Sequence, residues 1–468
     1  MPNLFEHTSA AIIPSKHMPS QVTLRVHRYT ILAAMMATSL GSIPSFAQDG
    51  QSVPTPQAPQ APGLESINDA RSSNRAATAF EPPVIEGSLE LDLRQTEAQD
   101  ADGILSRDTG RVVLELTLDI EQALGRHASM EARLELAGLH FTESRLDSSI
   151  DTTEYNLERL FLQLDPNPSL RIRIGRQELE DSMETIVSED LDGVQLVYER
   201  GRVELELSLT REDLFEASSV DRQDDITNTM ASAQFEFNKD TVLIPYVLHR
   251  SEQSFNGSIP SDTTWAGFQL ISEHGKSNWS YWLHGMGRTG DEDTSSGSED
   301  LSGVAIDAGV GYSARGLLDS TFTLGIAHAD GGSRSERFRQ SGLHSNDFAL
   351  NGKNSFRYLG EVFDPELTNI QILTLGWGAE PYKQWRTDVA LHSYQQVEAE
   401  DSLRGADIEF QPTGNDTDLG IAGDIIISYK HSKALEIQGT AGRFIPGDAF
   451  DGDRDDAWLA RLEIEYNF

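Results

Sequence analysis

The chain has 468 residues, with 37 Lys and Arg against 75 Asp and Glu, and therefore a formal net charge of -38. This charge argues against nucleic-acid binding, which requires a basic face. The chain has no cysteine, which excludes a disulfide framework, thiolate metal ligands and a cysteine nucleophile. No segment has the roughly 20 consecutive apolar residues of a transmembrane helix. The composition is compatible with a transmembrane β-barrel, because barrel strands alternate polar and apolar residues.

The first residues have the composition of an export signal. Two arginines precede the short apolar stretch 31–40, and Ser45 and Ala47 supply the small residues expected before a cleavage site. We therefore predict a cleaved signal peptide over residues 1–47, rather than a short buried helix. Residues 48–83 are rich in Pro, Gln, Ser and Ala, and we expect a disordered periplasmic segment there.

From residue 84 onward, apolar and polar residues alternate with a period of two, which is typical of strands with one wet face. In VELELSL at 203–209 the apolar residues occupy every second position, and LRIRI at 170–174 has the same pattern. About 18 such segments of roughly 8 to 12 residues follow one another, and a tilted strand of that length crosses the apolar layer of a membrane. The pattern predicts an all-β fold, a closed antiparallel transmembrane β-barrel over residues 84–468.

The segments between the predicted strands differ in length and charge. DPNPS at 165–169, YERGR at 198–202 and KHSK at 430–433 are short, whereas TGDEDTSSGSEDLSG at 289–303 is long and acidic. Outer-membrane barrels combine short periplasmic turns with long extracellular loops, and here we expect the loops to be acidic. Aromatic residues near strand ends predict girdles at the membrane interfaces, with ordinary strand propensity as the alternative. These residues are Tyr198, Trp265, Trp279, Tyr281, Trp282, Tyr312, Trp377, Trp458 and Tyr466.

The last predicted strand, WLARLEIEYNF at 458–468, ends on an aromatic residue with apolar residues at alternate preceding positions. This pattern resembles the assembly signal of outer-membrane barrels, so the barrel-assembly machinery is an expected partner. The residues expected to face lipid are Leu462, Ile464, Tyr466 and Phe468. The residues expected to face the lumen are Arg461, Glu463 and Glu465.

Three stretches of the body resemble the alginate-export family of outer-membrane channels. They are RIGRQELEDSMETIVSEDLDGVQLVYE at 173–199, FRQSGLHSNDFALNGKNSFRYLGEVFDPELTNIQILTLGWG at 338–378 and, more weakly, GRFIPGDAF at 442–450. The resemblance implies a monomeric barrel of about 18 strands whose lumen is narrowed by inward loops. In the family's type member the lumen is lined by arginines and passes an anionic uronic-acid polysaccharide.

One departure from the family pattern bears on the substrate. After GRQ many members have an aromatic, basic-rich stretch with a tryptophan, whereas this chain has SMETIVSED at 182–190, with three acidic residues and no aromatic one. The departure weakens the assignment of alginate itself. It leaves open an alginate-like polymer, its oligomers or another anionic solute.

A channel for polyanions needs cationic groups that face water inside the pore, and the planar fork of arginine suits carboxylates. Most of the candidates lie on the polar faces of predicted strands, while Arg176 lies in a family-like motif near an expected inward loop. The candidate substrate-binding residues are Arg133, Arg159, Arg173, Arg176, Arg357 and Arg461. Alternatively, such arginines pair with lumen acids and only stiffen the barrel. The natural partners are Glu135, Glu178, Glu361 and Glu463.

The acidic residues in the family-like motifs can be interpreted in two ways. They either hold a constriction loop against the arginines or belong to turns. They are Asp181, Asp190, Asp192, Asp364 and Glu366. The pairs Asp192-Gly193 and Asp364-Pro365 favour turns at Gly193 and Pro365.

The sequence indicates no catalytic or cofactor site. Neither HExxH nor GxSxG is present, and the 12 histidines are scattered. The acidic clusters QDADG at 99–103 and DGDRDD at 451–456 lack the full spacing of a dedicated Ca²⁺ loop, so solvated loops are the favoured interpretation. We therefore expect no cofactor, with loop-bound Ca²⁺ as the alternative, and no enzymatic activity.

These observations predict a monomeric channel in the bacterial outer membrane that passes an anionic polysaccharide such as alginate, or its oligomers, through an arginine-lined lumen. The expected partners are the anionic solute, lipopolysaccharide and outer-membrane lipid, and periplasmic proteins that deliver the polymer. The alternatives are a general uptake porin for anions or sugars, an outer-membrane barrel enzyme and a soluble acidic β-sandwich. The sequence names neither the solute nor the direction of transport.

Overall fold

The computed structural model describes residues 82–468, apart from 99–106, 144–147, 213–224, 254–259, 273–276, 295–296, 409 and 453. The chain divides into two compact units, Met1–Ala58 and Pro59–Phe468, and all described residues belong to the second. The predicted signal peptide and almost all of the predicted segment at 48–83 lie outside the described residues. Within the described part, no helix has the length and hydropathy needed to span a membrane.

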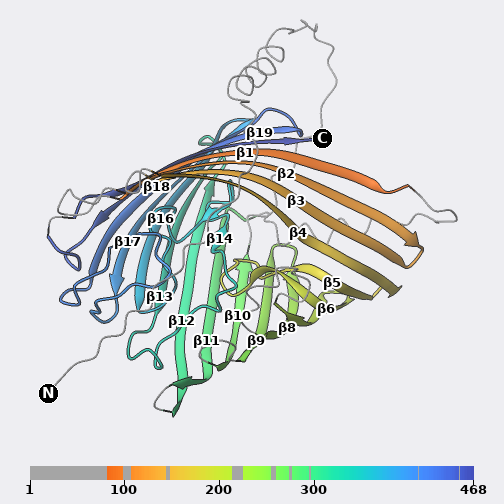
Figure 1. The fold of residues 1–468 in the computed structure, drawn as a ribbon, viewed down its shortest axis with the longest axis horizontal. Coiled ribbons are helices and arrows are strands. Elements are labelled where there is room, and N and C mark those ends of the chain that lie inside the picture. The colour runs from red at the N-terminus through yellow and green to blue at the C-terminus, as the bar shows by residue number, and fades with distance from the viewer. Residues whose placement is uncertain are drawn as a thin grey trace, which may run out of the picture. The chain divides into compact units, whose positions relative to one another are not determined.

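Eighteen strands form one antiparallel sheet, and two short strands form a second sheet (Figure 1). The first nine strands of the large sheet are β1 (Val84–Ala98), β2 (Arg107–Gly125), β3 (Ala128–Glu143), β4 (Ser148–Asn167), β5 (Leu170–Glu180), β6 (Ser188–Arg200), β7 (Val203–Arg211), β8 (Asp225–Asn238) and β9 (Thr241–Gln253). The other nine are β10 (Ser261–Ser272), β11 (Trp279–Thr294), β12 (Gly297–Ala314), β13 (Ser320–Ala329), β16 (Ile370–Tyr382), β17 (Trp385–Gln396), β18 (Asp418–Lys430), β19 (Leu435–Pro446) and β20 (Ala457–Asn467). The small sheet consists of β14 (Asp347–Phe348) and β15 (Phe356–Arg357).

The large sheet closes into a barrel, because its first strand pairs with both its second and its last strand. Leu91 of β1 lies opposite Leu114 of β2 and opposite Ile464 of β20. Closure lets neighbouring strands satisfy backbone hydrogen bonds that no water would satisfy in lipid. The predicted closed antiparallel barrel of about 18 strands is confirmed.

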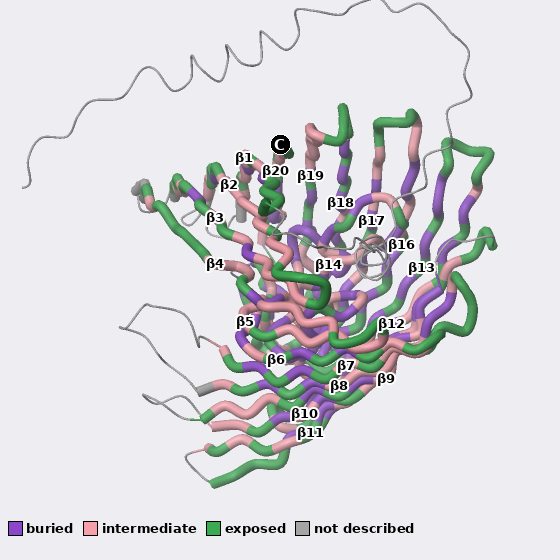
Figure 2. The backbone as a smooth tube through the Cα atoms, turned by 90° about the vertical axis from the view of Figure 1, so that its right-hand side faces the viewer, coloured by how far each residue is buried: buried purple, intermediate pink, exposed green. Residues whose placement is uncertain are grey.

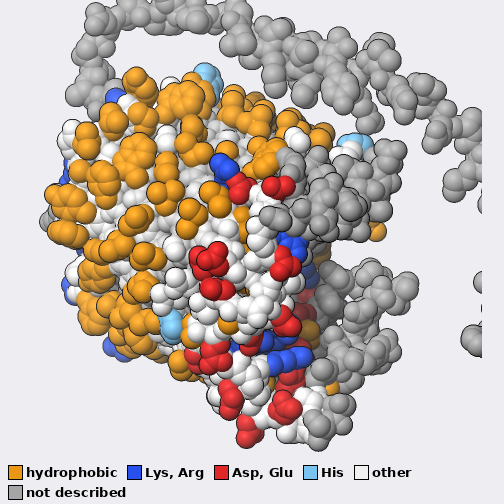
Figure 3. All heavy atoms as spheres, turned by 90° about the vertical axis from the view of Figure 1, so that its left-hand side faces the viewer, with side chains coloured by type: hydrophobic (Ala, Val, Ile, Leu, Met, Phe, Trp, Pro, Cys, Tyr) orange, Lys and Arg blue, Asp and Glu red, His pale blue; other side chains and the backbone are white. Residues whose placement is uncertain are grey.

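Side chains alternate between an apolar outer face and an inner face of mixed polarity. In β12, Val304 and Ile306 are exposed on the outside, whereas Ala305 and Asp307 are buried on the inside. Buried and exposed residues alternate in the same way along the neighbouring strands in Figure 2. Hydrophobic side chains cover much of the outer face seen in Figure 3, while acidic side chains gather along one side of that view. This outer surface is suited to contact with lipid tails.

The two ends of the barrel have different connections. Two-residue turns such as 201–202 and 239–240 join strands at one end, which we call the short-turn end. The start of β1 and the end of β20 lie at this same end, where Gly87 and Phe468 exchange backbone hydrogen bonds. The described long connections, including 330–369 and 397–417, leave from the opposite, long-loop end.

Residues 289–294 and 297–303, predicted as parts of a long loop, instead belong to the paired strands β11 and β12. β11 continues to Thr294 and β12 begins at Gly297, with Asp291 opposite Asp300. The loop prediction for this segment was wrong. Its polar sequence lacks strand alternation because, beyond the membrane, neither face of a hairpin has to be apolar.

The predicted aromatic girdle is confirmed only in part. Five of the aromatic residues are exposed on strands close to the short-turn end, which are Tyr198, Trp279, Tyr281, Tyr312 and Tyr466. The rings of Trp279 and Tyr312 pack at a centroid distance of 4.9 Å. Trp265 and Trp282 are instead buried, and the Trp282 indole donates a hydrogen bond to Asp307.

One side of the lumen is filled by an apolar core. Phe363, from the connection 330–369, stacks on Phe444 of β19 at 4.6 Å and packs edge-on against Tyr394 of β17. All three rings are fully buried, as are Ile370 and Ile372 of β16. The connections from the long-loop end therefore fold inward and anchor on the inner face of β16 to β19.

A second inward connection, 181–187 between β5 and β6, is joined to the first. Val187 forms a parallel bridge with Leu343, and the Gln340 amide donates to the Thr185 carbonyl oxygen at 2.8 Å. We call 181–187, 330–369 and 397–417 the inward segments. Their mutual contacts hold them as one body inside the barrel.

Candidate functional site

Three arginines lie side by side on the inner face of the barrel wall. Arg94 of β1 is directly opposite Arg461 of β20 on one side and Arg111 of β2 on the other. They face inward because the adjacent residues Val112 of β2 and Leu462 of β20 are exposed on the outer face, and Arg94 shares the register position of Arg111 and Arg461. Like charges at directly opposite positions repel, so this row requires compensating carboxylates or bound anions.

The three wall arginines share a cavity of about 180 Å³ with a fourth arginine, Arg357. Its acidic lining residues are Glu90, Asp92 and Glu115. Within this lining, four guanidinium groups therefore face three carboxylates. Arg461 is paired, with Nη2 at 3.3 Å from Asp92 and 2.9 Å from Glu463. We call Arg94, Arg111, Arg357 and Arg461 the arginine cluster.

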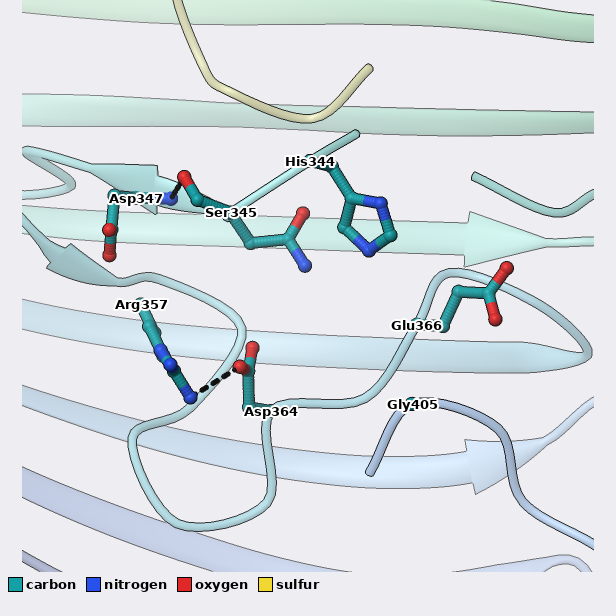
Figure 4. Close-up of a pocket in the computed structure, with 8 residues that line it drawn as sticks. His344, Ser345, Asp347, Arg357, Asp364, Glu366 and Gly405 are labelled. Carbon is teal, nitrogen blue, oxygen red and sulfur yellow. Dashed lines mark hydrogen bonds and ion pairs between the residues drawn. The ribbon is translucent and has the colours of Figure 1, made fainter. Parts of the chain in front are cut away.

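Arg357 comes from an inward segment rather than from the wall. It belongs to β15, whose other residue, Phe356, is buried in the apolar core. The Arg357 Nη1 atom lies 2.8 Å from Asp364 and 2.8 Å from Asp407, and Figure 4 shows the contact with Asp364. The sequence pattern had placed Arg357 on a barrel strand, and that placement was wrong. Its short alternating stretch forms a two-residue strand inside the lumen.

A second cavity, of about 270 Å³, lies on the other side of Arg357. It is lined by His344, Ser345, Asn346, Asp347, Arg357, Asp364, Glu366 and Gly405. Figure 4 shows the labelled ones of these residues around it, on the inward segments 330–369 and 397–417. Burial raises the pKa of Asp364 to about 7 and that of Asp347 to about 6, although Arg357 opposes both shifts. Burial alone would lower the pKa of Arg357, but the surrounding carboxylates raise it.

Arg133 and Arg159 form a separate group on β3 and β4. They lie directly opposite each other in the strand register. Arg133 is 2.7 Å from Asp119, and Arg159 pairs with Glu178 and lies 3.7 Å from Asp190. Both arginines therefore take part in ion pairs within the barrel wall.

Arg173 lines a third cavity, of about 190 Å³, together with Arg171 and several acids. Its guanidinium lies over the Phe161 ring at 5.1 Å and donates to Gln163 at 3.1 Å. The cavity's acids include Glu204 and Glu206. This group is less cationic than the arginine cluster.

Arg176 lies on β5 opposite Asp192 of β6, with the two side chains 3.6 Å apart. The next pair in the register is Gly175 and Gly193. A Cβ at Gly175 would overlap the Leu160 carbonyl oxygen, and one at Gly193 would overlap that of Leu209. Gly193 therefore serves close strand approach inside β6, and its prediction as a turn was wrong.

One acidic residue of the family-like motifs organises a turn, and the other four form ion pairs, two of them between barrel strands and two within an inward segment. Asp181 accepts hydrogen bonds from the backbone N–H groups of Met183, Ile186 and Val187, so it organises its own turn. The other four contact arginines. The pairs are Asp190 with Arg159, Asp192 with Arg176, Asp364 with Arg357, and Glu366 with Arg339.

Sequence reasoning missed Arg94 and Arg111. Both could have been found from alternation, because Leu89, Leu91 and Leu93 place Arg94 on the opposite face of its strand. It also missed Arg404, which lies among arginines of the inward segments. Their charges, and burial above all, lower its pKa.

The described residues contain no group of three or more His, Asp or Glu side chains that could hold a metal ion. Of the two acidic clusters considered for Ca²⁺, 99–103 lies outside the described residues, and so does residue 453 of the other.

The comparisons with known proteins agree with this architecture. A family model described as alginate export matches residues 88–461. Among solved structures, Pseudomonas aeruginosa OccK8 (OprE) aligns with a TM-score of 0.53 and 11% identity, covering 84% of this chain and 99% of that chain. P. aeruginosa OccK11 (OpdR) aligns with a TM-score of 0.51 and 14% identity, covering 82% and 96%.

P. aeruginosa OccK2 (OpdF), solved in complex with glucuronate, aligns with a TM-score of 0.50 and 12% identity, covering 82% and 98% of the two chains. No curated protein matches the chain by sequence. Outer-membrane barrels carry their short turns on the periplasmic side, so we take the short-turn end as the periplasmic end. The chain belongs to the alginate-export family, and it is a porin-like channel of the bacterial outer membrane.

Proposed function

We propose that the channel passes sugars that carry carboxylates, namely an anionic polysaccharide such as alginate, or its oligomers. Arginines of the lumen bind these carboxylates as the solute passes. The observation that carries the proposal is the arginine cluster, in which four guanidinium groups line one cavity of about 180 Å³. A guanidinium fork binds a carboxylate through two parallel hydrogen bonds.

The chemistry of the cluster suits transit rather than tight retention. The side chains of Arg94, Arg357 and Arg461 are 25%, 35% and 33% exposed, so water and solute reach them. Neighbouring carboxylates such as Asp92 compete for the same guanidinium groups. A channel must bind its solute strongly enough to admit it and weakly enough to release it, and this competition limits how long any anion stays bound.

A structural neighbour offers a precedent for the solute class. OccK2 (OpdF) shares the fold at low identity and was solved with glucuronate, a sugar carboxylate. The precedent supports sugar carboxylates as probes.

The test is the reversal potential of single channels in planar bilayers under a KCl gradient. We expect anion selectivity in the wild type and weaker anion selectivity in Arg94→Gln and Arg461→Gln, because each removes one lumen cation. Lys383→Gln is the matched control, since it removes one cation from an exposed periplasmic turn. Equal selectivity in all four proteins would contradict the proposal.

A second candidate, uptake of small anionic sugars, is favoured by the size of the cavities. The two cavities beside Arg357 measure about 270 and 180 Å³, a scale that suits single sugar units. Current block by glucuronate can be compared with block by an oligouronate of several units. Transit of glucuronate alone favours the small-solute channel, whereas transit of both favours the polymer channel.

A further inference from the structure

Asp407 is held by its backbone while its side chain contacts two arginines. Its N–H donates to the Phe363 carbonyl oxygen at 2.9 Å, and the next residue, Ile408, is buried in the apolar core. Its carboxylate accepts a hydrogen bond from Arg357 at 2.8 Å and lies 3.5 Å from Nη2 of Arg94. One carboxylate therefore bridges an inward segment and the barrel wall.

This bridge lies at the boundary between the two cavities. Arg357 lines both the cavity of about 180 Å³ on the wall side and the cavity of about 270 Å³ among the inward segments. Arg94 lines only the first. The contact of Asp407 with both arginines holds Arg357 in its place between the cavities.

Asp364 and Asp407 hold Arg357 in different ways. The side chain of Asp364 is 15% exposed, whereas that of Asp407 is 41% exposed. A carboxylate open to water exchanges its partners more readily, because solvent compensates the ions when they separate. Asp364 is thus the fixed partner of Arg357, and Asp407 is the exchangeable one.

We propose that Asp407 is a built-in competitor of the solute, which occupies the Arg94 and Arg357 guanidinium groups until a sugar carboxylate replaces it. The proposal rests on the proposed function, since it assumes that these arginines receive solute carboxylates. The replacing group has the same chemistry as the group it displaces. Its arrival releases the segment 397–417 from the wall, and that release couples solute binding to the width of the passage.

The first test measures glucuronate binding from current fluctuations of the full-length channel in planar bilayers. Removing the competing charge with Asp407→Asn should lower the half-maximal glucuronate concentration by about threefold to tenfold. Asp451→Asn is the matched control, because it removes an exposed acid in the connection between β19 and β20. It should leave that concentration unchanged. Glucose, which carries no carboxylate, should act equally on all three proteins.

The second test reports on the segment itself. Because the chain has no cysteine, a single Ser402→Cys substitution carries one spin label on an exposed position of 397–417. Label mobility should increase when glucuronate is added to the otherwise wild-type channel. With Asp407→Asn the label should already be mobile without glucuronate.

The outcomes separate this inference from the proposed function. If Asp407→Asn leaves the half-maximal concentration unchanged or raises it while Arg94→Gln still weakens anion selectivity, Asp407 is only a structural strap and the competitor role is wrong. An unchanged label mobility in both experiments has the same meaning. If Arg94→Gln and Arg461→Gln leave selectivity unchanged, the proposed function itself fails.

Discussion

The two sides of the barrel interior obey the same strand alternation but have opposite surroundings. On β16 to β19 the inward residues include Ile372 and Phe444, which are fully buried beneath the inward segments. On β20, β1 and β2 the inward residues include Arg461, Arg94 and Arg111, which line a cavity. Alternation selects which residues point inward, and the identity of those residues decides whether that side holds protein or water.

The packed side and the charged side of the lumen have different roles. The packed side anchors the inward segments, because buried aromatic rings lose much packing energy when they separate. The charged side supplies the groups that meet a solute. Changes on the packed side should therefore alter the position of the inward segments, whereas changes on the charged side should alter selectivity.

The largest expected effect comes from the packed side. Phe363→Ala removes a fully buried ring that stacks on Phe444 and should weaken docking of the inward segments by about 3–5 kcal/mol. Conductance should rise, and limited proteolysis should cleave the inward segments faster. Phe322→Ala is the control, because that ring is exposed on the outer face. Similar proteolysis of both variants would remove the distinction between the two environments.

A charge reversal tests the charged side. Arg111→Glu replaces an exposed cluster cation with an anion and should lower the anion-to-cation permeability ratio by about fivefold to tenfold. Proteolysis of the inward segments should stay at the wild-type rate. Lys433→Glu makes the same charge change in a periplasmic turn and should have a smaller effect on the ratio. A larger effect from Lys433→Glu would place the selective region at the turn instead.

The pH dependence of anion selectivity should involve Arg357, which belongs to an inward segment and also lines the cavity on the charged side. Since the pKa of Asp364 is raised to about 7 and that of Asp347 to about 6, lowering the pH from 8 to 5 protonates both. Each protonation removes a negative charge beside Arg357, so anion selectivity should increase as the pH falls. Reversal potentials across this range measure the change, and it should shrink in Asp364→Asn.

The same raised pKa values determine whether the docked inward segments become more or less stable as the pH changes. A carboxyl group with a raised pKa binds more protons in the folded than in the unfolded chain between its two pKa values. The inward segments should therefore be docked most stably below the ordinary pKa of these groups, near 4. Their docking should become less stable as the pH rises toward about 7. Proteolysis that becomes slower with rising pH would contradict this sign.

The smallest expected effect compares two neighbours on one strand. Ile372 is fully buried on the inner face of β16, and Leu373 is exposed on its outer face. Leu373→Ala should cost less than about 1 kcal/mol of unfolding free energy, whereas Ile372→Ala should cost about 2–4 kcal/mol, because only the inner site leaves a cavity in protein. Urea titrations of the detergent-solubilised barrel measure the difference. Equal costs would mean that lipid-facing packing matters as much as the inner core.

Much of the fold was predictable because alternation is a local property. The stretch VELELSL shows which residues of β7 face outward, whatever else the chain does. Where neither face is apolar, as at 289–303, the local pattern disappears and the strands were missed. Turn chemistry misled at Gly193, since a glycine that permits close strand approach has the same local signature as a turn glycine.

The candidate site was predictable only as a residue type. Arginines on polar strand faces were found, but their grouping depends on register, which places Arg461 beside Arg94 although they lie at opposite ends of the barrel sequence. Arg133, Arg159 and Arg176 form ion pairs in the barrel wall, whereas Arg357 lines two cavities, and nothing in their local sequence distinguishes the two cases.

The sequence by itself determined the strands and their lipid-facing surface, because a period of two is written residue by residue along each strand. Only the tertiary structure decided how the lumen is divided. That division depends on where the inward segments dock, and their docking brings Asp407 to Arg94 across 313 positions of sequence. Contacts of that separation arise from packing and closure, which no local pattern encodes.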